Sequence, residues 1–128
     1  MYEDKKILFL GVGGSGMAPL SIWMKNYSKK VYGYDDYLRN DTYECLKKYD
    51  VIIIDLLIKE ELINFDIIVY SNAIHNDNEF LRFARSKNIE CEKRGYFLSK
   101  ILAKKKVIAI VGSHGKTTTS GLVGHLIN

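Results

Sequence analysis

Short apolar runs alternate along this chain with stretches that have the periodicity of helices. Buried strands are predicted at residues 7–10, 31–34, 51–54, 67–70 and 107–111, with a brief strand at 89–92. Helices are predicted at residues 14–27, 42–48, 76–88 and 95–104, with a short turn or helix at 60–63. Such alternation is typical of βαβ units. It predicts an α/β, Rossmann-like fold with a mostly parallel sheet and helices on both faces.

Two of these helices have identifiable faces or ends. The first places apolar side chains at three- and four-residue spacing on one face: Met17, Leu20, Met24 and Tyr27. In the helix at 76–88, Asn76 is the expected N-cap, with Glu79 three residues later as its capping-box partner. The same helix is expected to turn Phe80, Leu81 and Ala84 inward. These faces predict core packing.

Composition and charge limit the classes of protein to consider. The chain has 128 residues, of which 47% are hydrophobic and 27% charged, as in an ordinary globular domain with one core. The net charge of +4 comes from 19 Lys and Arg against 15 Asp and Glu. The lysines occur as short clusters at the ends of predicted elements, where they suit helix dipoles and solvent. We therefore expect no nucleic-acid surface.

Cysteine usage and hydropathy bear on the compartment. Cys45 and Cys91 form no C-x-x-C pattern, which indicates a reducing compartment and argues against a disulfide scaffold or a zinc site. Residues 7–24 carry no charge, but the run contains four glycines and a proline, and its apolar part is too short for a signal peptide or a membrane span. We expect a cytoplasmic protein without a membrane partner.

The first glycine-rich loop follows the first strand and opens a helix. Gly11, Gly13 and Gly16 satisfy G-x-G-x-x-G, in which the glycines allow a tight turn, close approach to a diphosphate and packing of helix on strand. The free N–H groups of the helix N-terminus suit phosphate. Asp35 lies nineteen residues after Gly16 at the end of the second strand, where a carboxylate can accept hydrogen bonds from ribose. The mechanism recognises a diphosphate, and both NAD and UDP carry one.

A second loop follows the predicted strand at 107–111. Gly112 and Gly115 enclose two residues, so the loop is shorter than a Walker motif, which has four. The backbone of residues 113–116 can still surround phosphate oxygens. Lys116 can reach the outer phosphates and Thr117 can hold Mg²⁺. His114 is expected to shape the loop or face solvent.

The two loops together resemble the Mur ligases, ATP-dependent amino-acid ligases of peptidoglycan synthesis. The landmarks, in family order, are G-V-G-G-S-G-M at residues 11–17, S-N-A-I at 71–74 followed by D-N-E at 77–79, Arg94, and G-S-H-G-K-T-T-T at 112–119. The last is the most specific, because the shortened loop is the family's own form. The resemblance covers nearly the whole chain.

The resemblance implies two parts. Residues 1–105 would form a Rossmann-like UDP-sugar-binding domain, and residues 106–128 would be the first strand, loop and helix of a central P-loop ATPase domain. The implied UDP-sugar site is Gly11, Gly13, Gly14, Ser15, Gly16, Met17, Asp35, Ser71 and Asn72. The implied ATP site is Gly112, Ser113, His114, Gly115, Lys116, Thr117 and Thr118, with Lys116 and Thr117 in catalytic roles and Thr117 on Mg²⁺. No NAD is expected.

The landmarks are most similar to the family member that joins L-alanine to UDP-N-acetylmuramate. The resemblance implies that ATP phosphorylates the muramate carboxylate and that the amine of L-alanine then attacks the acyl phosphate. We expect this chain to be an amino-terminal piece that binds the UDP-sugar without catalysing ligation. Its last helix is expected to lack fixed order or to self-associate with another copy.

Two alternatives stay open. One is a recycling ligase that joins a whole peptide to UDP-N-acetylmuramate, because the residues that select the amine substrate would lie beyond this chain. The other is a non-catalytic Rossmann module that binds NAD or a related nucleotide, which leaves Gly115, Lys116 and Thr117 without a purpose. A small P-loop kinase is excluded by length, since no strand follows the second loop to supply a metal-binding acid.

Overall fold

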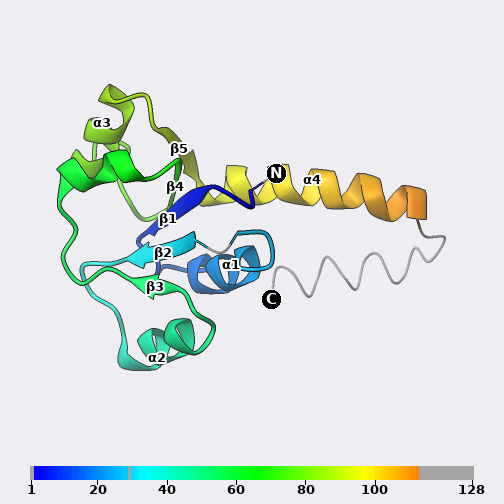
Figure 1. Cartoon of the computed structure of the whole chain (residues 1–128), viewed down its shortest axis with the longest axis horizontal. Coiled ribbons are helices and arrows are strands. Elements are labelled where there is room, and N and C mark those ends of the chain that lie inside the picture. Colours follow the sequence, from blue (N-terminus) through cyan, green and yellow to red (C-terminus); the bar gives the residue numbers. More distant parts are fainter. Residues whose placement is uncertain (1, 29, 113–128) are drawn as a thin grey trace.

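A five-stranded parallel sheet forms the centre of the molecule (Figure 1). The structure is a computed structural model and describes residues 2–28 and 30–112. The strands are β1 (Lys6–Leu10), β2 (Lys30–Tyr34), β3 (Ile52–Ile53), β4 (Ile67–Tyr70) and β5 (Glu90–Lys93). Their order in the sheet is β3-β2-β1-β4-β5, and every pair is parallel. The predicted α/β, Rossmann-like class is confirmed.

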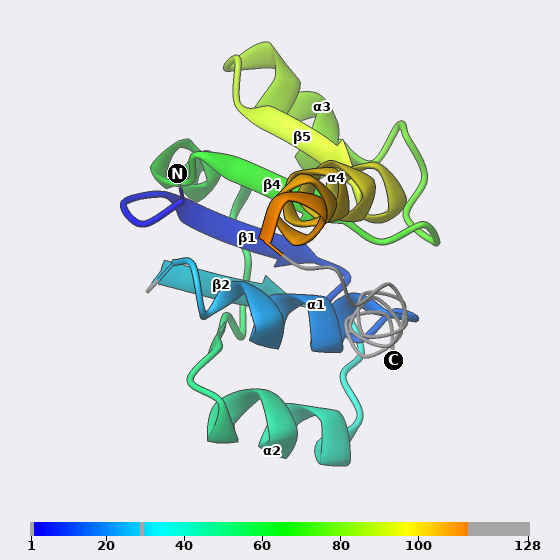
Figure 2. The same ribbon diagram turned by 90° about the vertical axis from the view of Figure 1, so that its right-hand side faces the viewer.

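Helices cover both faces of the sheet, as predicted. They are α1 (Met17–Met24), α2 (Asn40–Lys48), the 3₁₀ helix η1 (Lys59–Asn64), α3 (Glu79–Ser86) and α4 (Arg94–Gly112). Apolar side chains of α1, α2 and α4 join one core cluster, whereas those of η1 and α3 join the other. Figure 2 shows α1 and α4 in front of the sheet and α3 beyond it.

The two core clusters explain why the strands read as continuous apolar runs. In β1, Ile7 and Phe9 face the cluster under α1 and α4, and Leu8 and Leu10 face the cluster under α3. All four are at most 2% exposed. A strand with helices on both faces needs apolar residues at every position rather than at alternate ones. The predicted inward face of the first helix is confirmed for Met17, Leu20 and Met24, which are buried, whereas Tyr27 follows the end of α1 and is partly buried against the same cluster.

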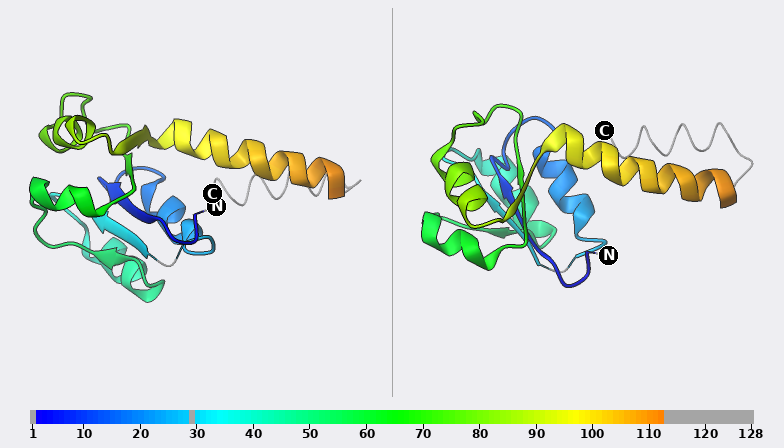
Figure 3. Two further views of the ribbon diagram at one scale, coloured as in Figure 1. Left: turned by 45° about the horizontal axis from the view of Figure 1, so that its top comes forward. Right: turned by 90° about the horizontal axis from the view of Figure 1, so that it is seen from above.

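The predicted strand at 107–111 is wrong. Residues 94–112 form one continuous helix, α4, which extends well away from the sheet (Figures 1 and 3). A strand completes its backbone hydrogen bonds only through a neighbouring strand, whereas a helix completes them internally. Within the described part of the chain no strand pairs with residues 107–111, and the helix that begins at Arg94 continues instead.

The predicted cap of α3 is also wrong. Asn78, not Asn76, is the N-cap, and its Oδ1 accepts a hydrogen bond from the N–H of Phe80 at 2.8 Å. The Oδ1 of Asn76 instead accepts from Nη2 of Arg85 at 2.9 Å. Of the residues predicted to turn inward, Leu81 and Ala84 are buried, and Phe80 is partly buried against the same cluster.

Two further expectations concern membranes and metals. Across residues 2–28 and 30–112, no helix is long and apolar enough to cross a membrane. Over the same residues, no three His, Cys, Asp or Glu side chains gather in a way that could hold a metal ion. Both Cys45 and Cys91 are free thiols.

Candidate functional site

Four strands end side by side at the same edge of the sheet. The last strand residues pair across the sheet in one row: Tyr34, Leu10, Tyr70 and Lys93. The residues that follow them form a second row at the carboxyl edge: Asp35, Gly11, Ser71 and Arg94. The strand order reverses between β1 and β4, which is where ligands bind in open parallel sheets.

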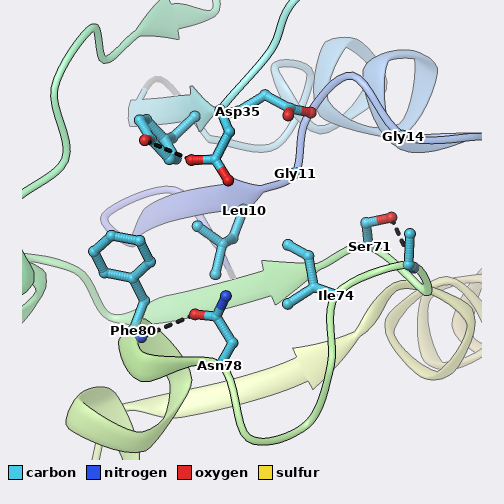
Figure 4. Close-up of a pocket in the computed structure, with 11 residues that line it drawn as sticks. Leu10, Gly11, Gly14, Asp35, Ser71, Ile74, Asn78 and Phe80 are labelled. Carbon is cyan, nitrogen blue, oxygen red and sulfur yellow. Dashed lines mark hydrogen bonds between the residues drawn. The ribbon is translucent and has the colours of Figure 1, made fainter.

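A cavity of about 140 Å³ opens at this reversal point. It is lined by residues from the ends of β1, β2 and β4 and from the start of α3: Leu10, Gly11, Gly14, Tyr34, Asp35, Asp36, Ser71, Ala73, Ile74, Asn78 and Phe80. Figure 4 shows Asp35 on one side of the cavity, Ser71 and Ile74 on another, and Asn78 and Phe80 opposite Asp35. The lining therefore combines apolar side chains with a few polar groups, as ligand pockets do.

The first glycine loop is held mainly by backbone hydrogen bonds, within the loop and to the end of β2. The N–H groups of Gly11 and Val12 both donate to the carbonyl of Tyr34, at 2.7 and 3.0 Å. The N–H of Gly14 donates to the carbonyl of Gly11 at 2.9 Å, and the N–H of Met17 donates to the carbonyl of Gly14 at 3.0 Å. These turns occupy residues 11–16, so α1 begins at Met17, later than predicted.

Two glycines in this loop are required by space and by backbone conformation. A Cβ on Gly14 would lie 2.5 Å from Oγ of Ser71 and 3.1 Å from the carbonyl oxygen of Gly11. Gly16 has φ +76°, in the left-handed region, and a Cβ there would lie 3.0 Å from Nη1 of Arg94. The loop therefore lies directly against the residues that follow β4 and β5.

Asp35 ties the glycine loop to the end of β2. Its Oδ2 accepts a hydrogen bond from the N–H of Gly13 at 2.8 Å, and its Oδ1 accepts from the N–H of Tyr37 at 3.2 Å. The carboxylate also lines the cavity. Each carboxylate oxygen has two lone pairs, so Asp35 can hold the loop and still accept a bond from a hydroxyl group.

Side chains add to the backbone turns of the loop at residues 71–78, in which the N–H groups of Ile74 and Asn78 donate to the carbonyls of Ser71 and His75 at 3.0 Å. Oγ of Ser71 accepts from the N–H of Ala73 at 3.1 Å. Nη1 of Arg85 donates to the carbonyl of Asn76 at 2.8 Å, and Nη2 donates to its side chain and, at 3.4 Å, to the hydroxyl of Tyr70. One arginine of α3 therefore fixes the middle of the loop.

Aromatic rings form the wall of the cavity nearest β2. The rings of Tyr34 and Phe80 meet edge to face, with centroids 6.1 Å apart. The hydroxyl of Tyr34 donates to Oδ1 of Asp36 at 2.9 Å. That hydrogen bond, together with burial and the nearby acidic charges, raises the pKa of Tyr34 above its ordinary value of 10.0. The phenol is therefore neutral at physiological pH.

The structure brings together part of the predicted UDP-sugar site. Gly11, Gly14, Asp35 and Ser71 line the cavity, and Gly13, Ser15 and Gly16 continue the loop beside it. Met17 is fully buried in the core, and Asn72 is exposed and outside the lining. Sequence reasoning missed Tyr34, Asp36, Asn78 and Phe80 as lining residues. Two signals could have identified some of them: Asp36 comes shortly after the end of β2, and Asn78 is the N-cap of α3.

The predicted ATP site cannot be placed in the same way. Gly112 is the last residue of α4. Ser113, His114, Gly115, Lys116, Thr117 and Thr118 lie outside the described residues.

Curated relatives match the chain over nearly its whole length. A protein of Francisella tularensis subsp. mediasiatica named UDP-N-acetylmuramate--L-alanine ligase is 42% identical over 125 residues. The match covers 97% of this chain but only 28% of that relative. A protein of Campylobacter curvus with the same name is 37% identical over 123 residues and is also covered to 28%. The chain thus spans just over a quarter of the length of the relatives it matches.

The fold and a family model agree with these relatives. The solved UDP-N-acetylmuramate-alanine ligase of Thermotoga maritima superimposes with a TM-score of 0.69 at 24% identity, over 80% of this chain and 24% of that one. The model described as "Mur ligase family, catalytic domain" matches residues 6–106, most of the chain. The sequence from the first strand to about two thirds of the way along α4 therefore carries the family's pattern, and the chain belongs to the Mur ligase family.

Proposed function

We propose that this chain supplies the UDP-sugar-binding part of an ATP-dependent ligase that joins L-alanine to UDP-N-acetylmuramate in peptidoglycan synthesis. The observation that carries the proposal is the 42% identity to a relative of that name, which extends over 97% of the chain. Residues 1–105 would be the nucleotide-sugar-binding unit, and residues 106–128 would belong to the ATP-binding unit.

The cavity suits one end of a uridine diphosphate. Its volume of about 140 Å³ is below the roughly 300–1,000 Å³ of pockets that enclose a whole ligand. A base would lie against Tyr34 and Phe80, and Asp35 would accept from the ribose. Figure 4 shows the amide nitrogen of Asn78 between Leu10 and Ile74, where it could donate to a base carbonyl. The diphosphate would then cross the glycine loop toward the N-terminus of α1.

The ligation chemistry would be supplied by the ATP-binding unit. Lys116 and Thr117 would contact the ATP phosphates and Mg²⁺, within the loop at residues 112–118. The muramate carboxylate would attack the γ-phosphorus and release ADP. The amine of L-alanine would then attack the acyl phosphate, form the amide and release phosphate. Free thiols at Cys45 and Cys91 support a cytoplasmic setting for this reaction.

Ligand titration followed by amide NMR shifts tests the proposal. UDP-N-acetylmuramate should saturate and move the amides of Gly11, Gly14 and Ser71, whereas NADH at the same concentration should not. Mg-ATP is titrated in parallel and should leave those three amides unmoved. Saturation by NADH at those residues, without a response to the UDP-sugar, would replace the ligase proposal with a dinucleotide-binding module.

A further inference from the structure

Arg94 occupies a position that the cavity does not explain. It is the first residue of α4 and stands in the row of residues that follow the strands, next to Ser71. Its Nη1 and Cζ lie 3.0 and 3.3 Å from the position that a Cβ on Gly16 would take. Gly16 is the N-cap of α1, so the guanidinium lies against the start of that helix.

The guanidinium has no partner in the described part of the chain. Its Nε is buried and makes no hydrogen bond, and no carboxylate of residues 2–28 or 30–112 forms an ion pair with it. A buried donor without a partner costs about 1–3 kcal/mol in a typical protein. Such a group in a folded structure calls for an explanation, for example a ligand that supplies the missing acceptor.

The N-terminus of α1, which lies beside Arg94, also favours an anion at this position. The N-terminus of α1 has no side-chain cap and no acidic residue in its first turn. It presents partial positive charge beside a full positive charge, and these repel each other. A phosphate placed between them would accept from the guanidinium fork and from backbone N–H groups, which relieves both problems.

Arg94 is held in place from both sides along the chain. Two residues earlier, the buried Glu92 accepts two hydrogen bonds from Nζ of Lys100, at 2.9 and 3.0 Å. Three residues later, Phe97 is fully buried and meets the ring of Phe9 edge to face. The join between β5 and α4 is therefore fixed, so the backbone from which the Arg94 side chain extends is in place before any ligand arrives.

We propose that Arg94 binds the diphosphate of the nucleotide, on the far side of the glycine loop from the cavity. This inference rests on the proposed function for the identity of the nucleotide. The base and ribose would occupy the cavity, and the two phosphates would extend past Gly14 to Gly16, where Arg94 and the N-terminus of α1 hold them.

The test measures UDP, uridine and inorganic pyrophosphate binding by the 128-residue chain and its variants. Arg94→Gln should weaken UDP binding about tenfold or more and leave uridine binding unchanged, because a bidentate charge-assisted contact is lost. Arg94→Lys should fall in between, since it keeps the charge but not the fork. Arg82→Gln is the matched control: Arg82 is an exposed arginine on α3 outside the cavity lining, and UDP binding should not change.

A measurement on the wild-type chain tests the inference even if an Arg94 variant fails to fold. The ¹H–¹⁵Nε signal of Arg94 should shift on addition of pyrophosphate, in parallel with the ³¹P signal of the anion. An unmoved Arg94 signal at saturating UDP would overturn the inference. So would equal losses of UDP and uridine binding in Arg94→Gln, since that pattern marks a structural role.

The outcomes separate the inference from the proposed function. If wild type binds UDP and Arg94→Gln binds it equally well, the inference fails and the proposed function stands. If wild type binds pyrophosphate through Arg94 but neither UDP nor UDP-N-acetylmuramate, the anion site stands and the proposed function fails.

Discussion

The two loops that meet at the cavity differ in how much their side chains contribute to holding them. The loop at residues 11–16 is folded by backbone hydrogen bonds and lies so close to its neighbours that Gly14 has no room for a side chain. The loop at residues 71–78 also has backbone turns, but side chains add to them, chiefly those of Ser71, Asn78 and Arg85. The first loop therefore requires that Gly14 has no side chain, whereas the second requires its polar side chains. Adding a methyl group should damage the first, and removing a polar group should loosen the second.

The largest effect is expected from Gly14→Ala. The new Cβ would lie 2.5 Å from Oγ of Ser71, which must turn away and give up its bond from Ala73, and it would still lie 3.1 Å from Cβ of Ser71 and from the carbonyl oxygen of Gly11. We expect the free energy of unfolding to fall by about 2–3 kcal/mol. UDP binding should weaken more than in any other variant considered below. Urea denaturation and UDP titration measure the two changes.

Gly95→Ala is the matched control for that substitution. Gly95 lies in α4 and a Cβ there meets nothing within 4 Å. Alanine favours a helix over glycine by roughly 0.5–1 kcal/mol, so this variant should be equal to wild type or slightly more stable. If both variants lose similar stability, crowding at Gly14 is not the cause.

Asp35→Ala tests the one side chain on which the first loop relies. The N–H groups of Gly13 and Tyr37 lose their acceptor, and we expect about 1–2 kcal/mol of lost stability. Hydrogen exchange should accelerate at those two amides. Asp35→Asn keeps an acceptor oxygen and should lose less. Unchanged exchange at Gly13 in the alanine variant would show that the backbone alone holds the loop.

Arg85→Met should loosen the second loop and leave the first unchanged. The bonds to Asn76 and Tyr70 are lost, and we expect about 1 kcal/mol of destabilisation because Arg85 is exposed. Amide shifts should change over residues 71–78 and not over residues 11–16. Arg82→Met, one turn earlier on α3, supplies the control. Equal shifts in both loops would mean that the loops are coupled and that the contrast between them is wrong.

The smallest effect is expected from Tyr34→Phe, at the wall between the loops. At neutral pH the stability should change by less than about 0.5 kcal/mol, since the bond to Asp36 is exposed. The folded-state pKa of Tyr34 is raised, so its contribution is complete below pH 10.0 and is lost as pH rises through the folded value. In an ultraviolet titration of the folded protein, the variant should lack one of the tyrosines that ionise at the highest pH. If the missing tyrosine is instead one that ionises at lower pH, the raised pKa of Tyr34 is wrong.

Much of the fold could be predicted because the sheet is buried on both faces. Residues 7–10, 31–34 and 67–70 carry no charged side chain and are mostly apolar, and such runs are too short for a helix. The glycine loop and Asp35 could be predicted for a related reason. Their spacing follows from one βαβ unit, so local sequence determines where they meet.

The parts that sequence could not predict depend on distant contacts. Local rules favour Asn76 as the cap, because Glu79 completes a capping box, but in the structure its side chain accepts from Arg85, nine residues later, and Asn78 caps the helix. The pattern at residues 107–111 favours a strand, but a strand needs a neighbour that the described sheet does not supply. Arg94 reaches Gly16 only because β4 lies in register between β1 and β5, which no spacing in the sequence reveals.

The shared register at the edge of the sheet makes the length of each strand a constraint on binding. Asp35, Gly11, Ser71 and Arg94 stand in one row because each follows a strand whose last residues are paired across the sheet. Side chains alternate between faces, so deleting one residue from β5 would move Arg94 about 3.3 Å along the strand and turn it to the opposite face. Insertions and deletions in the four strands are therefore expected to be far rarer than substitutions.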